Sequence, residues 1–344
     1  MSNSSVLIIL GMILLFGSCA EEKEILISEP PFGEVCVLNQ NEELLGQINS
    51  IDYVNDTSFV VCSASQIYLY GFSGDLIRKI GRSGRAKAEY VSPRIVRYGS
   101  NHIVAWDGML GKFIWFNMDG QALGEVGCET AVSDFIVDGD YLWIYTADAE
   151  SDGCVVKLNV NTGEAEPQNF ILVDGGHHIL TRWSSRAPMV MDDGVLWCMP
   201  KNKLEIYRSD SDQTCRFESS SFTAENIDDP NSLISARQKM EEHLCNNSVV
   251  VAIHPMKRDM RVLTAEGYLQ RTKDGLDRSH RYYSVYSVNL SSEKAKCLIR
   301  FPQESFSLDH LMIGLNCFYC LSHKVSGEDD QYAIEKIVLG SNSK

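Results

Sequence analysis

Basic residues are scarce in this chain of 344 residues, where 31 Lys and Arg stand against 46 Asp and Glu and the net charge is −15. Nucleic acids and anionic lipid surfaces attract proteins through clustered positive charge, so the imbalance argues against both as partners. An acidic, well-solvated surface is sufficient to explain the excess, and the charge therefore points to no particular substrate.

Motifs of familiar enzymes are missing as well. There is no Gly-x-Ser-x-Gly nucleophile turn and no Gly-x-Gly-x-x-Gly, and Gly108–Lys112 has the wrong spacing for a phosphate loop. Cys317 and Cys320 fall on one predicted strand, where residues three apart point to opposite faces. Asp148–Gly153 resembles a calcium loop without its closing Glu. We therefore expect no metal, no cofactor and no catalytic residues.

The N-terminus lacks both a long apolar run and a positive charge. Its apolar stretch, Val6–Phe16, is shorter than the ~20 residues of a membrane-spanning helix and fits the core of an export signal. Small residues precede Cys19, and glutamates follow it. This arrangement predicts a lipoprotein signal over residues 1–18, acylation of Cys19 and a tether over residues 19–30.

The lipoprotein prediction implies an exported protein that its N-terminal lipid holds at the outer membrane, facing the periplasm or the cell surface. Two features depart from the usual signal. Residues 1–5 carry no Lys or Arg, and Phe16 stands where Leu is usual. A short buried helix and a cleaved signal without a lipid are the alternatives.

Eleven cysteines occur in the chain, and most of those after Cys19 lie in apolar, strand-like runs. An exported protein can pair its cysteines, whereas a buried free cysteine packs as a small hydrophobic side chain. The position of these residues within the runs favours mostly free thiols.

One hairpin pattern recurs along the chain: a short strand, a tight polar turn and a more hydrophobic strand. The copies begin at Ile51, Arg94, Ser133, Pro188, Val249 and His310. A second, more amphipathic strand pair follows each hairpin, and the pairs at Tyr68 and Ile114 match almost residue for residue. Six such four-stranded units predict an all-β protein, a six-bladed β-propeller with antiparallel blades.

The sixth unit lacks an outer strand of its own. We expect this strand from the other end of the propeller region, near Glu34–Asn39 or Leu44–Ile48, so that strands from both termini close the ring. Such closure removes the free sheet edges that favour aggregation. The predicted propeller covers residues 31–344.

The segment Phe72–Val96 resembles the blade signature of the six-bladed NHL-like and TolB-like propeller lipoproteins of gut-type Gram-negative bacteria. In that signature an aromatic turn leads to Ile-Gly and then to a Gly-rich stretch that ends in Glu-Tyr. This chain departs from it at Arg85–Ala88, where more glycine is usual. The resemblance implies the fold and export, and it transfers no catalytic residues.

Residues 221–247 fall outside the repeat and predict a helical insertion. Asp229 can cap a helix and Pro230 suits its first position. A surface helix over the rim of the propeller is the simpler interpretation, and a lid over the channel mouth is the alternative.

Two links between units stand out as basic in an acidic protein. We expect them on one face of the ring, where they could line a channel mouth that receives an anion such as a carboxylate or a uronic acid. The candidate binding residues are Arg85, Arg94, His177, His178, Arg182, Trp183 and Arg186. Ordinary solvated loops are the alternative reading of these links.

Two kinds of tryptophan occur. Trp106, Trp143 and Trp197 recur at like positions in their hairpins, which favours packing between blades over a carbohydrate platform. Trp183 lies beside Arg182 and is the tryptophan we would test for sugar stacking.

These observations favour a monomeric binding module for a peptide, a glycan or a partner protein. The alternative function is a propeller hydrolase or lyase with its site at the channel mouth. Such an enzyme would need inward-pointing His, Asp or Glu side chains that converge on one point.

Overall fold

The computed structural model describes residues 32–40, 45–147, 153–182, 186–225, 227, 237–273, 275–277, 279–303, 310–326 and 329–338. The predicted signal, Cys19 and Trp183 lie outside these ranges.

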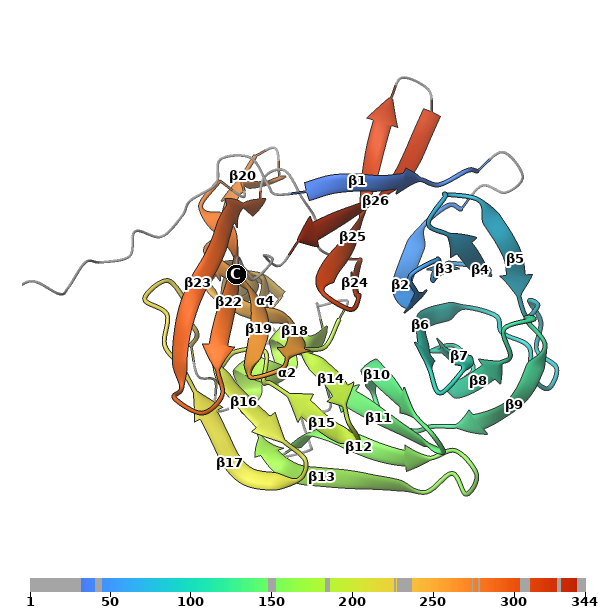
Figure 1. The fold of residues 1–344 in the computed structure, drawn as a ribbon, viewed down its shortest axis with the longest axis horizontal. Coiled ribbons are helices and arrows are strands. Elements are labelled where there is room, and N and C mark those ends of the chain that lie inside the picture. Colours follow the sequence, from blue (N-terminus) through green and yellow to red (C-terminus); the bar gives the residue numbers. More distant parts are fainter. Residues whose placement is uncertain are drawn as a thin grey trace, which may run out of the picture.

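Six four-stranded antiparallel sheets surround a central axis and follow one another clockwise along the chain in Figure 1. Blade 1 contains β2 (Ile48–Asn55), β3 (Ser58–Ser63), β4 (Ile67–Gly71) and β5 (Leu76–Ile80). Blade 2 contains β6 (Pro93–Gly99), β7 (His102–Asp107), β8 (Lys112–Phe116) and β9 (Ala122–Gly127). Blade 3 contains β10 (Val132–Asp138), β11 (Tyr141–Thr146), β12 (Gly153–Asn159) and β13 (Ala165–Leu172).

The second half of the ring repeats this order. Blade 4 contains β14 (Met189–Asp192), β15 (Val195–Cys198), β16 (Glu205–Arg208) and β17 (Ser211–Arg216). Blade 5 contains β18 (Val249–Met256), β19 (Asp259–Gly267), β22 (Arg281–Asn289) and β23 (Lys294–Pro302). Blade 6 contains β24 (Leu311–Ile313), β25 (Cys317–Ser326), β26 (Asp329–Val338) and β1 (Phe32–Val37). The prediction of a six-bladed propeller is confirmed.

The ring closes through β1, which forms the outer edge of blade 6. It runs antiparallel to β26, with Phe32 opposite Ile337 and Val37 opposite Ala333. Of the two segments expected to supply this strand, the one near Glu34–Asn39 is therefore correct. Strands from opposite ends of the chain thus join the ring into one body.

Each pair of neighbouring blades encloses its own core of buried apolar side chains. Trp106, Trp143 and Trp197 pack in three successive cores, as their recurrence predicts. Cys317 packs between blades 6 and 1, whereas Cys320 packs between blades 5 and 6. The two thiols of the Cys-x-x-Cys pair therefore point into different cores.

The blade-signature segment contains a tight loop between blades 1 and 2, and the characteristic residues of the signature stabilise this loop. Gly81 has φ of 64°, and a Cβ there would lie 2.5 Å from the Phe116 ring, so a side chain is excluded. The hydroxyl of buried Tyr90 donates to the Ile80 carbonyl at 2.6 Å. Glu89 accepts a backbone N–H of the same loop at 2.9 Å. The Ile-Gly and Glu-Tyr pairs thus hold the link in place.

Two helices interrupt the sheets in the part of the chain that the structure describes. The predicted insertion contains α4 (Arg237–Asn246), while the proposed cap at Asp229 lies outside the described residues. A second helix, α2 (Gly175–Arg182), lies in the link between blades 3 and 4, where the sequence predicted no helix. Neither helix is long and apolar enough to cross a bilayer.

Candidate functional site

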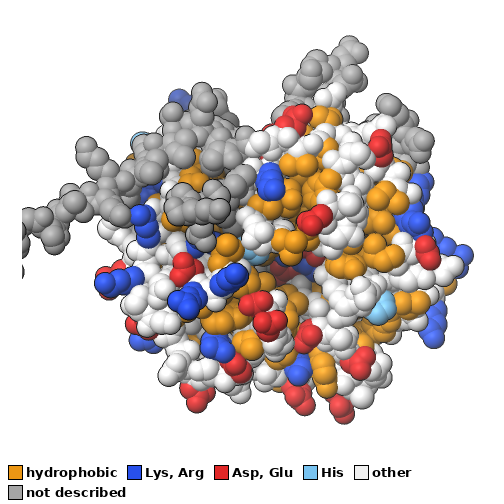
Figure 2. Space-filling view, in the orientation of Figure 1, with side chains coloured by type: hydrophobic (Ala, Val, Ile, Leu, Met, Phe, Trp, Pro, Cys, Tyr) orange, Lys and Arg blue, Asp and Glu red, His pale blue; other side chains and the backbone are white. Residues whose placement is uncertain are grey.

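The chain passes from one blade to the next at the same end of every sheet, which we call the connecting face. Both helices lie in links on this face, as does the loop that carries Arg85. Figure 2 shows one side of the molecule, on which Lys and Arg are interspersed with Asp and Glu around exposed apolar side chains. On this side no charge of one sign dominates, despite the net charge of −15.

An ion pair crosses the central channel. Arg186, which precedes β14 in blade 4, donates from Nη1 to Asp52 of blade 1 at 2.8 Å and to the Leu311 carbonyl of blade 6 at 3.2 Å. Both charged side chains are about nine-tenths buried. Arg186 therefore ties three blades together across the axis.

A second ion pair joins blades 2 and 3 beside the first. Nε of Arg97 donates to Asp134 at 2.7 Å, and its Nη1 donates to the Ile51 and Val96 carbonyls. The other oxygen of Asp134 accepts the Ala187 N–H at 2.7 Å. Burial lowers the pKa of Arg97, although the Asp134 carboxylate opposes that shift.

Lys201 completes the channel cluster, which we define as Asp52, Arg97, Asp134, Arg186 and Lys201. Its ammonium donates to the Arg186 carbonyl, and its backbone N–H donates to Nδ1 of His177 at 3.0 Å. Burial lowers the pKa of Lys201 to about 7.

The histidines predicted for the channel mouth are interior residues of α2. His177 and His178 are buried with ring centroids 5.3 Å apart, and Thr181 lies 3.3 Å from Nε2 of His177. Burial lowers the pKa of His177, and the neighbouring His178 and Lys201 lower it further. A neutral imidazole here supports the attachment of α2 to blade 4.

The structure brings only some of the predicted site residues together. His177, His178 and Arg186 lie around Lys201. Arg85 is exposed in the loop between blades 1 and 2, and Arg94 is exposed at the start of β6. No hydrogen bond or ion pair of the described residues connects these two arginines with the channel cluster. The side chains of Arg182 and Trp183 lie outside the described part.

A pocket of about 550 Å³ lies at the connecting face of blade 5, beside the link that joins it to blade 4, and we call it the seam pocket. This volume lies within the range of about 300–1,000 Å³ typical of small-molecule sites. Its walls come from the link after β17, from β19, β22 and β23, and from the ends of the β19–β22 loop. The lining residues are Ser221, Glu266, Gly267, Tyr268, His280, Tyr282 and Arg300.

A buried ion pair forms the polar end of the seam pocket. Glu266 is 1% exposed and accepts from Nη2 of Arg300 at 2.9 Å. Four hydroxyls also donate to its carboxylate, those of Ser219, Thr264, Ser284 and Tyr286. Burial and the nearby carboxylate raise the pKa of Tyr286, which keeps its hydroxyl a donor. Because the carboxylate is saturated with donors, its role is to fix Arg300 and the pocket floor.

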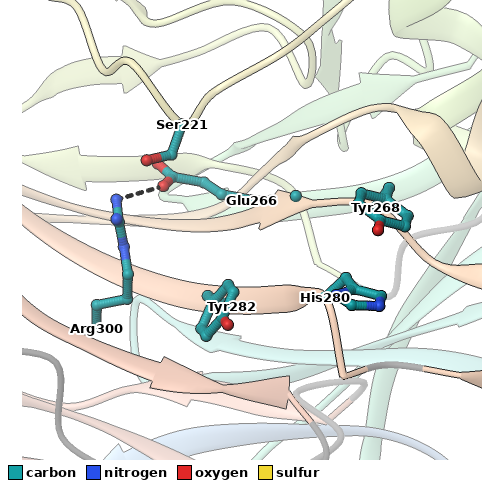
Figure 3. A pocket seen from close by; sticks show the side chains of 7 residues that line it. Ser221, Glu266, Tyr268, His280, Tyr282 and Arg300 are labelled. Carbon is teal, nitrogen blue, oxygen red and sulfur yellow. Dashed lines mark hydrogen bonds and ion pairs between the residues drawn. The ribbon is translucent and has the colours of Figure 1, made fainter.

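Aromatic side chains form the opposite end, as Figure 3 shows. Tyr268 and His280 stack with ring centroids 4.8 Å apart at 19°, and Tyr268 is 47% exposed. Tyr282 lies between this stack and the ion pair. The hydroxyls of Tyr268, Tyr282 and Ser221 have no hydrogen-bond partner among the described residues. The pocket thus joins an apolar wall to free neutral hydroxyls.

Gly267 sets the position of the aromatic wall. Its φ is 86°, and a Cβ there would lie 2.2 Å from the carbonyl oxygen of His280. The next residue, Tyr268, donates its N–H to that carbonyl at 3.3 Å. The close approach of the two backbones therefore stacks the Tyr268 and His280 rings.

Sequence reasoning missed this pocket, although one signal was present. The β3–β4 loop of blade 1 spans residues 64–66, whereas the corresponding loop of blade 5 spans residues 268–280 and contains the small hairpin β20 (Gln270–Thr272) and β21 (Gly275–Asp277). A long insertion at one position of a repeated unit often carries function.

The described residues hold no group of three or more His, Cys, Asp or Glu side chains arranged to bind a metal ion. In the channel cluster and in the seam pocket, the carboxylates already accept from arginine. These features define a six-bladed propeller with a neutral, aromatic-lined pocket in one blade seam.

Comparison with known proteins agrees with this class. Residues 37–266 match a family, DUF5128, described as a 6-bladed beta-propeller. The match spans more than half of the chain, so the protein belongs to this family. No curated protein matches the chain in sequence.

Two solved structures from Bacteroides share the fold. A candidate exported protein of Bacteroides fragilis is 14% identical, with a TM-score of 0.60 over 92% of this chain and 99% of its own. A DUF4221 member from Bacteroides vulgatus is 10% identical, with a TM-score of 0.63 over 90% of this chain and 96% of its own. At such identities the likeness concerns the fold alone.

Proposed function

We propose that this protein is an exported, lipid-anchored binding module that holds a peptide, a glycan or a partner protein in the seam pocket. The observation that carries the proposal is a set of hydroxyls without a partner among the described residues, beside an exposed aromatic wall in a pocket of about 550 Å³. A binding site needs such groups, because each gains a hydrogen bond when a ligand replaces water.

The channel cluster supports binding over hydrolysis. Arg97 and Arg186 each pair with a carboxylate inside the ring, at 2.6 and 2.8 Å. A general acid or base must reach the substrate, whereas these carboxylates accept from arginine and from backbone N–H groups. We therefore assign the cluster to ring stability.

Binding is tested with printed arrays of oligosaccharides and of peptides, probed with the full-length chain in detergent. We expect signals from at least one array, lost in Tyr268→Ala and kept in Tyr141→Ala. Tyr141 is a suitable control because it is 36% exposed and begins β11 at the opposite end of the blades. Silence on both arrays would leave only a partner protein as the ligand, and equal signals from both variants would contradict the proposed site.

The anchor rests on Cys19 and on the sequence before it, and the Bacteroides fragilis relative that shares the fold is itself a candidate exported protein. Cells grown with an alkyne-tagged fatty acid should label the wild-type chain and leave Cys19→Ala unlabelled. Labelling of both forms would show that the lipid is attached to another residue. Labelling of neither form would contradict the lipid anchor. Protease treatment of intact cells then separates surface display from a periplasmic position.

A further inference from the structure

We propose that the seam pocket takes an uncharged sugar ring, stacked on the wall that Tyr268 and His280 form. The inference rests on the function proposed above and names the ligand class of the same site. Three properties of the pocket lead to it: its charge, the kind of polar groups it offers, and the exposed aromatic surface.

The charge of the pocket disfavours an ionic ligand. Arg300 is the only Lys or Arg in the described lining, and its Nη2 donates to Glu266 at 2.9 Å while Nε donates to Ser284 at 3.0 Å. The pair is neutral as a unit, since one positive and one negative group are in contact. An anionic ligand would meet Glu266 close by, and a cationic ligand would meet Arg300.

The free polar groups match sugar hydroxyls. Ser221, Tyr268 and Tyr282 each present a hydroxyl, which can donate one hydrogen bond and accept others. A sugar hydroxyl has the same dual character, so either partner can supply the proton. A carboxylate or an ammonium group would use only half of this capacity.

The aromatic wall supplies the face on which a pyranose ring packs. The C–H groups on one side of such a ring form a flat apolar patch, which fits an aromatic plane. Tyr268 is 47% exposed, and its stacking on His280 at 4.8 Å holds it before a ligand arrives. Pre-organisation of this kind reduces the side-chain entropy that binding costs.

A peptide fits the pocket less well. Extended peptides bind by adding a strand to an exposed sheet edge, where main-chain groups give most of the affinity. In the seam pocket, Glu266 and Tyr282 belong to β19 and β22, which are interior strands of blade 5 with a neighbour on both sides, and the aromatic wall comes from the β19–β22 loop.

The test is affinity gel electrophoresis of the full-length chain in detergent, through gels that contain a neutral polysaccharide (mannan, xylan or a β-glucan) or polygalacturonate. We expect retardation in at least one neutral gel and none in polygalacturonate. Tyr268→Ala should weaken the apparent affinity at least tenfold and Tyr282→Phe about fivefold, since the first loses the platform and the second one hydroxyl. Tyr141→Ala should migrate like the wild type.

Each outcome separates the inference from the proposed function. Retardation by polygalacturonate alone, or signals from peptide arrays with none from neutral glycans, would overturn the sugar assignment while the binding function stands. Retardation in a neutral gel that neither Tyr268→Ala nor Tyr282→Phe changes would place the sugar elsewhere. A chain that binds no glycan overturns the sugar assignment, and one that also binds no peptide leaves only a partner protein in the proposed function.

Discussion

The channel cluster and the seam pocket each contain a buried arginine paired with a carboxylate, and they differ in what surrounds the pair. In the channel, Arg186 and Asp52 come from blades 4 and 1 and lie about nine-tenths buried. In the seam, Glu266 and Arg300 belong to the same blade and lie at the end of an open pocket. The first arrangement fastens the ring, and the second fixes the floor of a site.

Substitution of Arg97 should have the largest effect, and it tests whether the ion pairs of the channel cluster stabilise the ring. Asp134 would remain buried without its charged partner, and such a loss costs about 3–5 kcal/mol. We expect Arg97→Ala to lower the free energy of unfolding by that amount in urea titrations. The control is Arg82→Ala, because Arg82 is 78% exposed and its pair with Glu89 should contribute about 0–1 kcal/mol. Equal losses of unfolding free energy in both variants would contradict a stabilising role of the Arg97–Asp134 pair.

Lys201 makes the contribution of the channel cluster to stability depend on pH. Its pKa is about 7 in the folded protein against 10.5 for an ordinary lysine, because burial disfavours the charge. Between pH 7 and 10 the unfolded chain therefore binds the extra proton. Stability should rise with pH in this window, by about 1.4 kcal/mol per pH unit from this group.

The variant Lys201→Met isolates this contribution. The difference in unfolding free energy between wild type and variant should shift in favour of the wild type by about 2–3 kcal/mol between pH 7.5 and 9.5, as measured by urea titration at each pH. A constant difference across that range would show that the amine titrates as an ordinary lysine.

Neutralisation of Glu266 tests whether the Glu266–Arg300 pair of the seam pocket serves the site more than the fold. Glu266→Gln keeps the size of the side chain but leaves Arg300 without its carboxylate, so we expect a loss of about 2 kcal/mol in unfolding free energy. The substitution would also remove one negative charge from the floor of the pocket. Polygalacturonate should therefore retard this variant more than the wild type in the same gels. A loss of unfolding free energy as large as that of Arg97→Ala would show that the Glu266–Arg300 pair stabilises the fold as strongly as the channel pairs do.

The propeller itself could be predicted from the sequence because each blade repeats a local pattern. Alternating apolar and polar residues on both sides of short turns predict hairpins, and six hairpins predict a ring. The strand Phe32–Val37 was also foreseeable, since the sixth unit lacked an outer strand. These features depend on neighbouring residues in the chain.

The channel cluster depends on residues that only the closed ring brings together, and the seam pocket depends on contacts between strands and loops of blade 5 that no local pattern marks. Asp52 and Arg186 are 134 positions apart, and nothing near either of them predicts the other. Arg186 was expected to receive an external anion, and in the structure an internal carboxylate occupies that role. Glu266 lies in a sequence that predicts an ordinary strand, and its five donors come from the other strands of blade 5, from β19 itself and from the link that precedes the blade.

Tyr268→Ala should have the smallest effect on stability and the clearest effect on function. The ring of Tyr268 is 47% exposed and, among the described residues, stacks on His280 alone, so its loss should change the unfolding free energy by less than about 1 kcal/mol. The same variant should lose at least tenfold in apparent affinity for a neutral polysaccharide. Urea titration and affinity electrophoresis on one preparation measure both quantities. Tyr268 would then serve the ligand and not the fold, whereas Arg97 serves the fold. A loss of unfolding free energy above about 2 kcal/mol in Tyr268→Ala would instead show that Tyr268 has a structural role.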